Sequence, residues 1–260
     1  MAEKLIETTE DNHILYIYFN RPAQKNAFNM QMLKQLSEAY LQLEENEKLQ
    51  VAVVAARGKH FTLGLELDDV AKHMKKHKSY PFIHGVDPWG IQGKPRTKPV
   101  IVAAHGFCLT LGIELMLASD IRIAAPSTKF GQIEVQRGIM AFGGATFRMP
   151  QQFGWGNAMR YLLTGDMFGA DEALRIGLIQ EVVPQADLEK KASELALKIT
   201  QQAPLAVRAT LASAMTAFRE SEEKCRGNLM PVTLELMKSS DAEEGVNSFI
   251  EKRQAKFQGK

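Results

Sequence analysis

The stretch at residues 98–144, KPVIVAAHGFCLTLGIELMLASDIRIAAPSTKFGQIEVQRGIMAFGG, decides the fold. Its pattern predicts a buried strand over 99–104, a glycine-containing turn, a short apolar helix beginning near Gly112, a second strand over 121–125 and a glycine-rich loop. Almost every residue in it is apolar or small. The stretch therefore belongs to the core of an α/β domain rather than to its surface.

Two carboxylates, Glu114 and Glu134, interrupt this apolar stretch. An ionised carboxylate is destabilised when it leaves water without a partner, so both residues are candidates for a functional site. The alternative for Glu114 is a structural ion pair with Arg122. The alternative for Glu134 is pairing with Arg137, three residues later on a helix.

Two glycine turns, Leu63-Gly64-Leu65 and Thr110-Leu111-Gly112, stand just before predicted helices. The backbone N–H groups at a helix start have no partner within the helix, and they lie at its positive end. Two such groups directed at one point would form an oxyanion hole, beside which two glutamates could act as acid and base. The sequence by itself does not bring the two turns together.

The composition is that of an ordinary globular protein, with 45% hydrophobic and 24% charged residues among 260. A net charge of +2 and the lack of a long basic block give no case for a nucleic-acid partner. We find neither an apolar run of about 18 residues nor a signal peptide, and two cysteines suit a reducing compartment. These features lead us to expect a soluble, cytoplasmic protein that does not enter membranes.

The remaining chain alternates strands and helices before it becomes wholly helical. Strands are predicted at 5–9, 14–19, 51–56 and 178–183, and helices at 29–43, 67–77, 153–163, 171–175, 186–202, 204–225 and 241–258. The last helices carry more apolar surface than a simple tail needs. We expect them to pack on the core or on another subunit.

Residues 71–98 combine a lysine-rich segment with many breakers. His73 and His77 have the i, i+4 spacing of a metal pair, but the lysines around them repel a cation, so a solvated helix face is favoured. The same alternative is favoured over a phosphate site. For His105 and Cys108, core packing is favoured over a nucleophilic pair.

Hydrolase and nucleotide-binding motifs are absent from the sequence. It contains no G-x-S-x-G and no G-x-x-x-x-G-K-[ST], and the nearest approach to a dinucleotide fingerprint, at 154–159, follows no strand. The pair of glutamates with the two glycine turns remains the strongest candidate site.

Six segments, in order, resemble the crotonase (enoyl-CoA hydratase/isomerase) superfamily. They are FNRPAQKNAFN (19–29), GKHFTLGLELDDV (58–70), PVIVAAHGFCLTLGIELMLASDIRIA (99–124), FGQIEVQRGIMAFGGATFRM (130–149), LLTGDMFGADEALRIGLIQEVV (162–183) and FIEKRQAKF (249–257). The resemblance covers essentially the whole chain. It implies an α/β fold with a crotonase-like spiral of ββα units over 1–200 and a helical trimerisation region over 201–260, which would form a trimer or a dimer of trimers.

The resemblance also implies a hydro-lyase that adds water to a 2-enoyl-CoA and gives a 3-hydroxyacyl-CoA. It implies no metal and no cofactor other than the coenzyme A of the substrate. Two alternatives stay open. One is another acyl-CoA reaction of the same fold, carried out by an isomerase, a thioester hydrolase or a C–C lyase, and the other is a non-catalytic protein that binds CoA thioesters.

Residue by residue, the resemblance implies that the backbone N–H groups of Leu65 and Leu111 hold the thioester oxygen. Glu114 would orient and deprotonate water, and Glu134 would exchange a proton with Cα. The residues implied to bind substrate or CoA are Ala23, Lys25, Leu63, Leu65, Glu66, Leu67, Leu111, Ile133, Phe249 and Lys252, the last two reaching the CoA of a neighbouring subunit.

The sequence departs from the superfamily pattern at the two turns. Thr110-Leu111-Gly112 stands where three glycines are common, Leu65-Glu66 replaces Ala-Asp, and Ile133 replaces the proline before the second glutamate. A carboxylate that dienoyl isomerases carry near Phe142 is absent. Acyl-chain specificity would lie in 71–98, where Trp89 or Phe82 could shape the pocket.

Overall fold

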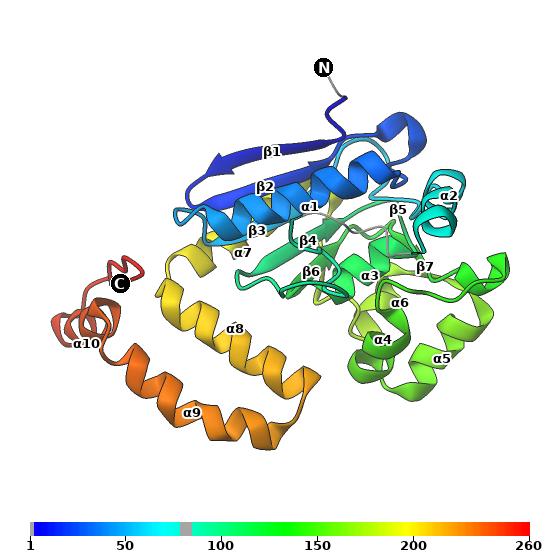
Figure 1. Cartoon of the computed structure of the whole chain (residues 1–260). Coiled ribbons are helices and arrows are strands. Elements are labelled where there is room, and N and C mark those ends of the chain that lie inside the picture. Colours follow the sequence, from blue (N-terminus) through cyan, green and yellow to red (C-terminus); the bar gives the residue numbers. More distant parts are fainter. Residues whose placement is uncertain (1–2, 79–84) are drawn as a thin grey trace.

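The computed structural model describes residues 3–78 and 85–260, and Phe82 lies outside them. Within these residues the larger sheet has the strand order β1-β2-β3-β4-β6-β9 and is parallel except for β1 (Figure 1). Its strands are β1 (Ile6–Asp11), β2 (Ile14–Phe19), β3 (Val51–Ala56), β4 (Val100–Ala104), β6 (Ile121–Ala124) and β9 (Glu181–Val182). The β1–β2 hairpin closes through Asn12 and His13, both at positive φ, as a two-residue turn requires.

Both faces of this sheet are buried, which explains why its strands are apolar throughout rather than alternating. Val54 and Val102 face a core cluster that includes side chains of α1 (Met30–Glu45), whereas Val53 and Ile101 face a cluster completed by α7 (Leu188–Thr200). The predicted cap of α1 is confirmed, since the Asn29 side chain accepts a hydrogen bond from the Met32 N–H at 2.8 Å.

A second, three-stranded sheet was not predicted. Its strands are β5 (Phe107–Leu109), β7 (Lys129–Gly131) and β8 (Met167–Gly169), with β5 and β7 parallel and β8 antiparallel to β7. Three residues are too few to show a strand period, so the sequence predicted only a turn and a loop there. This sheet carries the chain into and out of the region of the two glutamates.

The remaining helices of the core surround the two sheets. They are α2 (Leu67–His77), α3 (Leu111–Leu117), α4 (Ala145–Phe153), α5 (Trp155–Thr164) and α6 (Ala170–Arg175), with the 3-10 turns η1 (Pro22–Gln24), η2 (Glu134–Arg137) and η3 (Gln185–Asp187). The prediction of one helix over 153–163 missed α4. The break between α4 and α5 falls at Gly154, whose φ is 77°.

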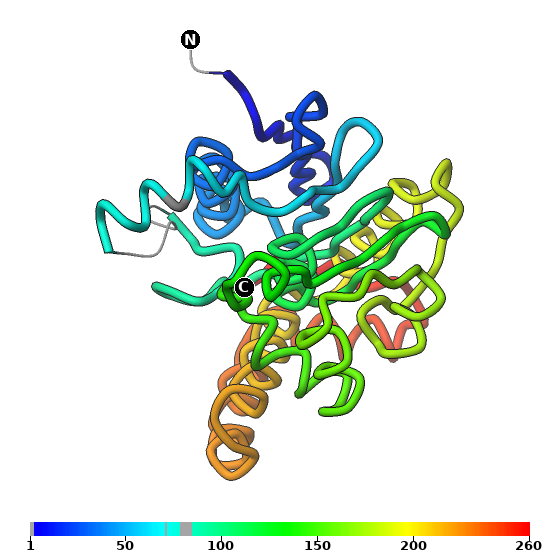
Figure 2. Tube along the Cα trace, turned by 90° about the vertical axis from the view of Figure 1, so that its right-hand side faces the viewer, coloured from blue at the N-terminus to red at the C-terminus, as the bar shows by residue number. Residues whose placement is uncertain are grey.

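The chain ends in three helices, of which α8 and α9 project from the body in both views (Figures 1 and 2). They are α8 (Pro204–Arg219), α9 (Glu222–Leu236) and α10 (Ser240–Glu251). The prediction of a single helix over 204–225 was wrong, because the chain turns at Glu220 and the side chain of Ser221 caps α9. Similarly, α10 ends early because Lys252 takes a left-handed φ of 55°. The boundary at residue 200 stays a prediction.

Candidate active site

The two glycine turns lie side by side. The loop before Leu65 runs along β5, with hydrogen bonds from Phe61 N–H to the His105 carbonyl at 2.8 Å and from Thr62 N–H to the Phe107 carbonyl at 2.9 Å. A Cβ on Gly64 would lie 1.7 Å from Thr110 Oγ1, so only glycine fits there. The convergence that the sequence could not establish is therefore built by backbone hydrogen bonds.

The N–H groups of Leu65 and Leu111 are free to bind a ligand. Among residues 3–78 and 85–260, neither group donates a hydrogen bond to the protein. Leu111 is the first residue of α3, where a helix leaves its N–H groups unpaired, and Leu65 stands two residues before α2. Two free donors on touching turns make a candidate oxyanion hole.

Thr110 holds the second turn in an unusual conformation. Its φ of 49° and ψ of −114° lie outside the regions that a β-branched residue normally adopts, at a cost of about 1–3 kcal/mol. The turn is fixed on both sides of the strain, by Thr110 N–H donating to the Gly131 carbonyl at 2.9 Å and by Trp89 Nε1 donating to the Leu111 carbonyl at 2.9 Å. Trp89 thus buttresses the turn from behind.

Glu114 is 1% exposed and sits on α3, one turn from Leu111. Its Oε1 accepts a hydrogen bond from the Ala145 N–H at 3.0 Å, at the start of α4. Burial raises the pKa of this carboxyl to about 8, and the nearby Glu134 raises it further against the opposing effect of the hydrogen bond. At neutral pH the group is therefore poised to hold or release a proton.

Glu134 opens η2 and is 7% exposed. Gln132 Nε2 donates to its Oε1 at 2.9 Å, while its Oε2 is buried and has no partner among the described residues. Burial raises the pKa of this carboxyl to about 7. A buried oxygen without a partner beside a second titrating carboxyl suits proton transfer to a ligand.

The ion-pair alternatives for both glutamates are wrong. Arg122 donates instead to Gln152 Oε1 at 2.6 Å and to the Gly177 carbonyl at 3.2 Å. Arg137 forms no ion pair in the parts of the chain that the structure describes, and the same is true of Glu114 and Glu134. Their burial is thus not explained by a structural salt bridge.

Most of the predicted CoA-binding residues surround the first turn. Lys25 accepts a backbone hydrogen bond from Leu63 at 3.3 Å, and Ala23 lies in η1 just before it. Glu66 is ion-paired to Arg21, and Leu67 begins α2 with 43% exposure. The remaining three separate into one near the site and two far from it: Ile133 directly precedes Glu134, whereas Phe249 and Lys252 belong to the end of α10, which lies across the molecule from α2 and α3 (Figure 1).

Several residues that position the site were missed. Gln132, Gly143 and Ala145 contact the glutamates, and a Cβ on Gly143 would lie 2.6 Å from Glu114 Oε2. Asn26 is buried and its side chain donates to the carbonyls of Arg57 and His60, which fixes the first turn. The available signal was their place beside the singled-out motifs, since glycine and amide residues there have mainly structural uses.

The other candidates gather no site. The rings of His73 and His77 are 4.5 Å apart, but no group of three metal-ligating side chains occurs in residues 3–78 and 85–260. Cys108 is fully buried against Met116, and burial raises its thiol pKa, as core packing would. No helix in this described part is long and apolar enough to span a bilayer.

Comparison with known proteins gives a consistent assignment. A family model described as "Enoyl-CoA hydratase/isomerase" matches residues 9–260. The crotonyl-CoA hydratase of Syntrophomonas wolfei is 31% identical, over 99% of this chain and 99% of its own. A crystal structure of a probable enoyl-CoA hydratase/isomerase from Mycobacterium abscessus has a TM-score of 0.95 and 44% identity over 99% of both chains, and that of an enoyl-CoA hydratase from Mycobacterium tuberculosis has a TM-score of 0.89 and 32% identity. The expected fold is confirmed, and the chain belongs to the enoyl-CoA hydratase/isomerase family.

Proposed function

We propose that this protein is an enoyl-CoA hydratase that adds water across the double bond of a 2-enoyl-CoA. The observation that carries the proposal is the pair of buried glutamates without ion pairs, beside two touching turns with free N–H groups. Hydration needs one group to take a proton from water and one to give a proton to carbon. Relatives named as hydratases support the same reaction.

In this mechanism the thioester oxygen accepts hydrogen bonds from the N–H groups of Leu65 and Leu111. These donors stabilise the negative charge that develops on that oxygen as the water oxygen bonds to C3. Glu114 takes the proton that water loses, and Glu134 in its protonated form gives a proton to C2. The product is a 3-hydroxyacyl-CoA, and the two carboxyls have exchanged protonation states.

The rest of the proposal concerns the surroundings of this chemistry. Ala23, Lys25, Leu63, Glu66, Leu67 and Ile133 line the path of the CoA and acyl groups. Phe249 and Lys252 act on the CoA of a neighbouring subunit in a trimer or a dimer of trimers. The reaction needs no metal or cofactor besides the substrate's own coenzyme A, and it takes place in the cytoplasm.

The test is the loss of conjugated-thioester absorbance across 2-enoyl-CoAs of increasing chain length. Glu114→Gln and Glu134→Gln should each lower kcat by about 100- to 10,000-fold, because each removes one proton-transfer group and keeps the shape of the side chain. The affinity for CoA thioesters should change little. Activity above half of wild type in either variant would refute the two-glutamate mechanism, and a need for Glu134 alone would indicate an isomerase.

A further inference from the structure

A cavity of about 520 Å³ lies behind the candidate active site, between α8 and the ends of α3 and α4. Two of its lining residues also belong to the site. Trp89 donates to the Leu111 carbonyl, and Leu117 follows Glu114 by three residues on α3. The cavity is therefore separated from the reacting groups by no more than these side chains and their neighbours.

Two guanidinium groups meet in this cavity. Arg148, from α4, is 6% exposed, and Arg219 is the last residue of α8. A Cβ on Gly90 would lie 3.6 Å from Arg148 Nη2 and 3.4 Å from Arg219 Nη2, so both groups approach the same point. Two like charges held close together are unfavourable unless an anion joins them.

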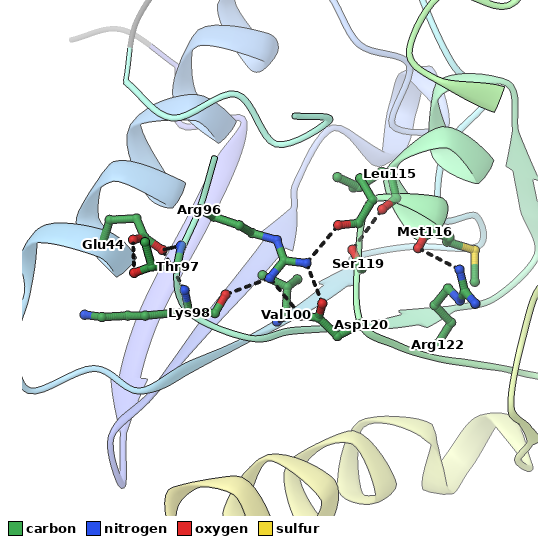
Figure 3. A network of polar contacts seen from close by, with 11 residues as sticks. Glu44, Arg96, Thr97, Lys98, Val100, Leu115, Met116, Ser119, Asp120 and Arg122 are labelled. Carbon is green, nitrogen blue, oxygen red and sulfur yellow. Dashed lines mark hydrogen bonds and ion pairs between the residues drawn. The ribbon is translucent and has the colours of Figure 1, made fainter. Parts of the chain in front are cut away.

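The nearby carboxylates are already engaged. Arg96, also in the lining, binds both oxygens of Asp120 at 2.7 Å, as Figure 3 shows. Asp87 accepts hydrogen bonds from three backbone N–H groups, those of Trp89, Ile91 and Gln92. The cavity thus has two acids for three arginines.

Neither of the two remaining arginines is neutralised. In the described ranges 3–78 and 85–260, Arg148 and Arg219 form no ion pair, and the only printed side-chain hydrogen bond of Arg148 goes to the Gly143 carbonyl at 3.1 Å. Desolvation, followed by the charge of Arg219, lowers the pKa of Arg148 to about 10. A nearly buried guanidinium with unused donors is costly unless a ligand supplies the counter-charge.

We propose that this cavity binds a carboxylate at the far end of the acyl chain, held between Arg148 and Arg219. The substrate class is then a 2-enoyl-CoA whose chain ends in a carboxylate, an inference that rests on the proposed hydratase function. The planar fork of an arginine matches a carboxylate with two parallel hydrogen bonds. Leu117, Phe147 and Phe218 give the cavity apolar walls for the methylene groups between the two ends.

An uncharged chain end discriminates against itself in such a cavity. It would leave both guanidinium groups desolvated without a partner, and sites built to bind a polar group reject analogues that lack it. The substrate chain must pass Trp89 to reach the arginines, which places this side chain between the reacting carbons and the terminal carboxylate.

The experiment compares two substrates of equal length, the CoA thioesters of pent-2-enedioic acid and of 2-pentenoic acid. Wild type should favour the first in kcat/KM by about 10- to 100-fold, the range that charge-assisted hydrogen bonds give. Arg148→Met and Arg219→Met should each lose at least about tenfold of this preference. Arg226→Met, the same change on an exposed arginine of α9 outside the cavity, should keep it.

A binding measurement separates this inference from the proposed function. Affinities of the saturated CoA thioesters of pentanedioic and pentanoic acid are measured by calorimetry on wild type, Arg148→Met and Arg219→Met. A preference for the first that depends on the arginines, without hydration of either enoyl-CoA, would support the cavity and refute the hydratase. Hydration of 2-pentenoyl-CoA with no preference for the carboxylate would overturn the cavity assignment and keep the hydratase.

Two further arms close the remaining routes. Arg148 also holds the Gly143 carbonyl beside Glu114, so its variant can lose activity for both substrates, whereas Arg219 has no printed contact with the site and gives the decisive ratio. Free pentanedioate is titrated separately. If the free dicarboxylate binds with the same arginine dependence and the thioester carboxylate confers no gain, the cavity is a site for a free anion and the acyl assignment is overturned.

Discussion

At the residue scale, Glu114 shows two opposing effects of its surroundings. The N–H group at the start of α4 stabilises its ionised form, while loss of water stabilises the neutral form, and the loss of water is larger because the side chain is almost fully buried. Glu134 has one hydrogen bond from Gln132 and the same excess of desolvation. The pair is therefore tuned to exchange protons near neutral pH.

This tuning predicts a bell-shaped dependence of kcat/KM on pH. Below about pH 7 both carboxyls are protonated and no base remains, and above about pH 8 both are ionised and no acid remains. We expect the maximum between these values, measured with a neutral 2-enoyl-CoA at constant ionic strength. A profile flat from pH 5 to 9 would show that the two groups do not titrate in the reaction.

At the element scale, the oxyanion hole depends on close contact between two turns from different parts of the chain. Gly64 and Thr110 touch, and the strain at Thr110 is maintained by hydrogen bonds on both sides of it. A proline at Leu111 would not test the N–H group cleanly, because the residue before proline is restricted to extended conformations that Thr110 does not have. A change at Gly64 tests the contact instead.

Gly64→Ala should separate the turns, because its Cβ would overlap Thr110 Oγ1 and its φ is +90°. Loss of one oxyanion donor lowers kcat by about 100- to 1,000-fold, so we expect a fall of that size with the far-ultraviolet circular dichroism unchanged. Gly156→Ala in α5 is the matched control, since a Cβ there has open space around it. Replacing Thr110 by glycine as well should recover part of the lost rate. Equal rates in both single variants would rule out a required contact.

At the scale of the whole molecule, the chain ends in helices with exposed apolar side chains. Exposure reaches 68% for Met237, 84% for Phe249 and 69% for Ile250. A monomer rarely leaves such a surface in water, so it is suited to a partner subunit. We therefore expect wild type to sediment as a trimer or a dimer of trimers at micromolar concentration.

Phe249→Glu should shift this assembly toward smaller species, because a charge would replace an apolar side chain at the subunit contact. If Phe249 also reaches a neighbour's CoA, affinity for the CoA thioester should fall in the same variant. Arg226→Glu, on the same helical region but already exposed and charged, serves as control. Unchanged sedimentation together with unchanged CoA affinity would contradict both expectations.

The sequence predicted what local periodicity encodes. The strands at 14–19 and 51–56 and the helix capped by Asn29 were found because apolar runs and cap residues are local signals. The small sheet was missed because its strands have three residues each. The contact of Gly64 with Thr110 and the pairing of Arg96 with Asp120 join distant segments, which no single-chain pattern reports.

The hydrogen bond from Trp89 to the Leu111 carbonyl makes the molecule its own spectroscopic probe. The chain has two tryptophans, of which Trp89 is fully buried and Trp155 is 72% exposed. A Trp155→Phe variant would leave one indole, whose emission should lie to the blue and resist quenching by acrylamide. Occupation of the oxyanion hole changes the field around that indole, so the emission should report binding of a CoA thioester without any turnover. Emission that does not respond to saturating thioester would mean that the turn and its buttress do not sense the ligand.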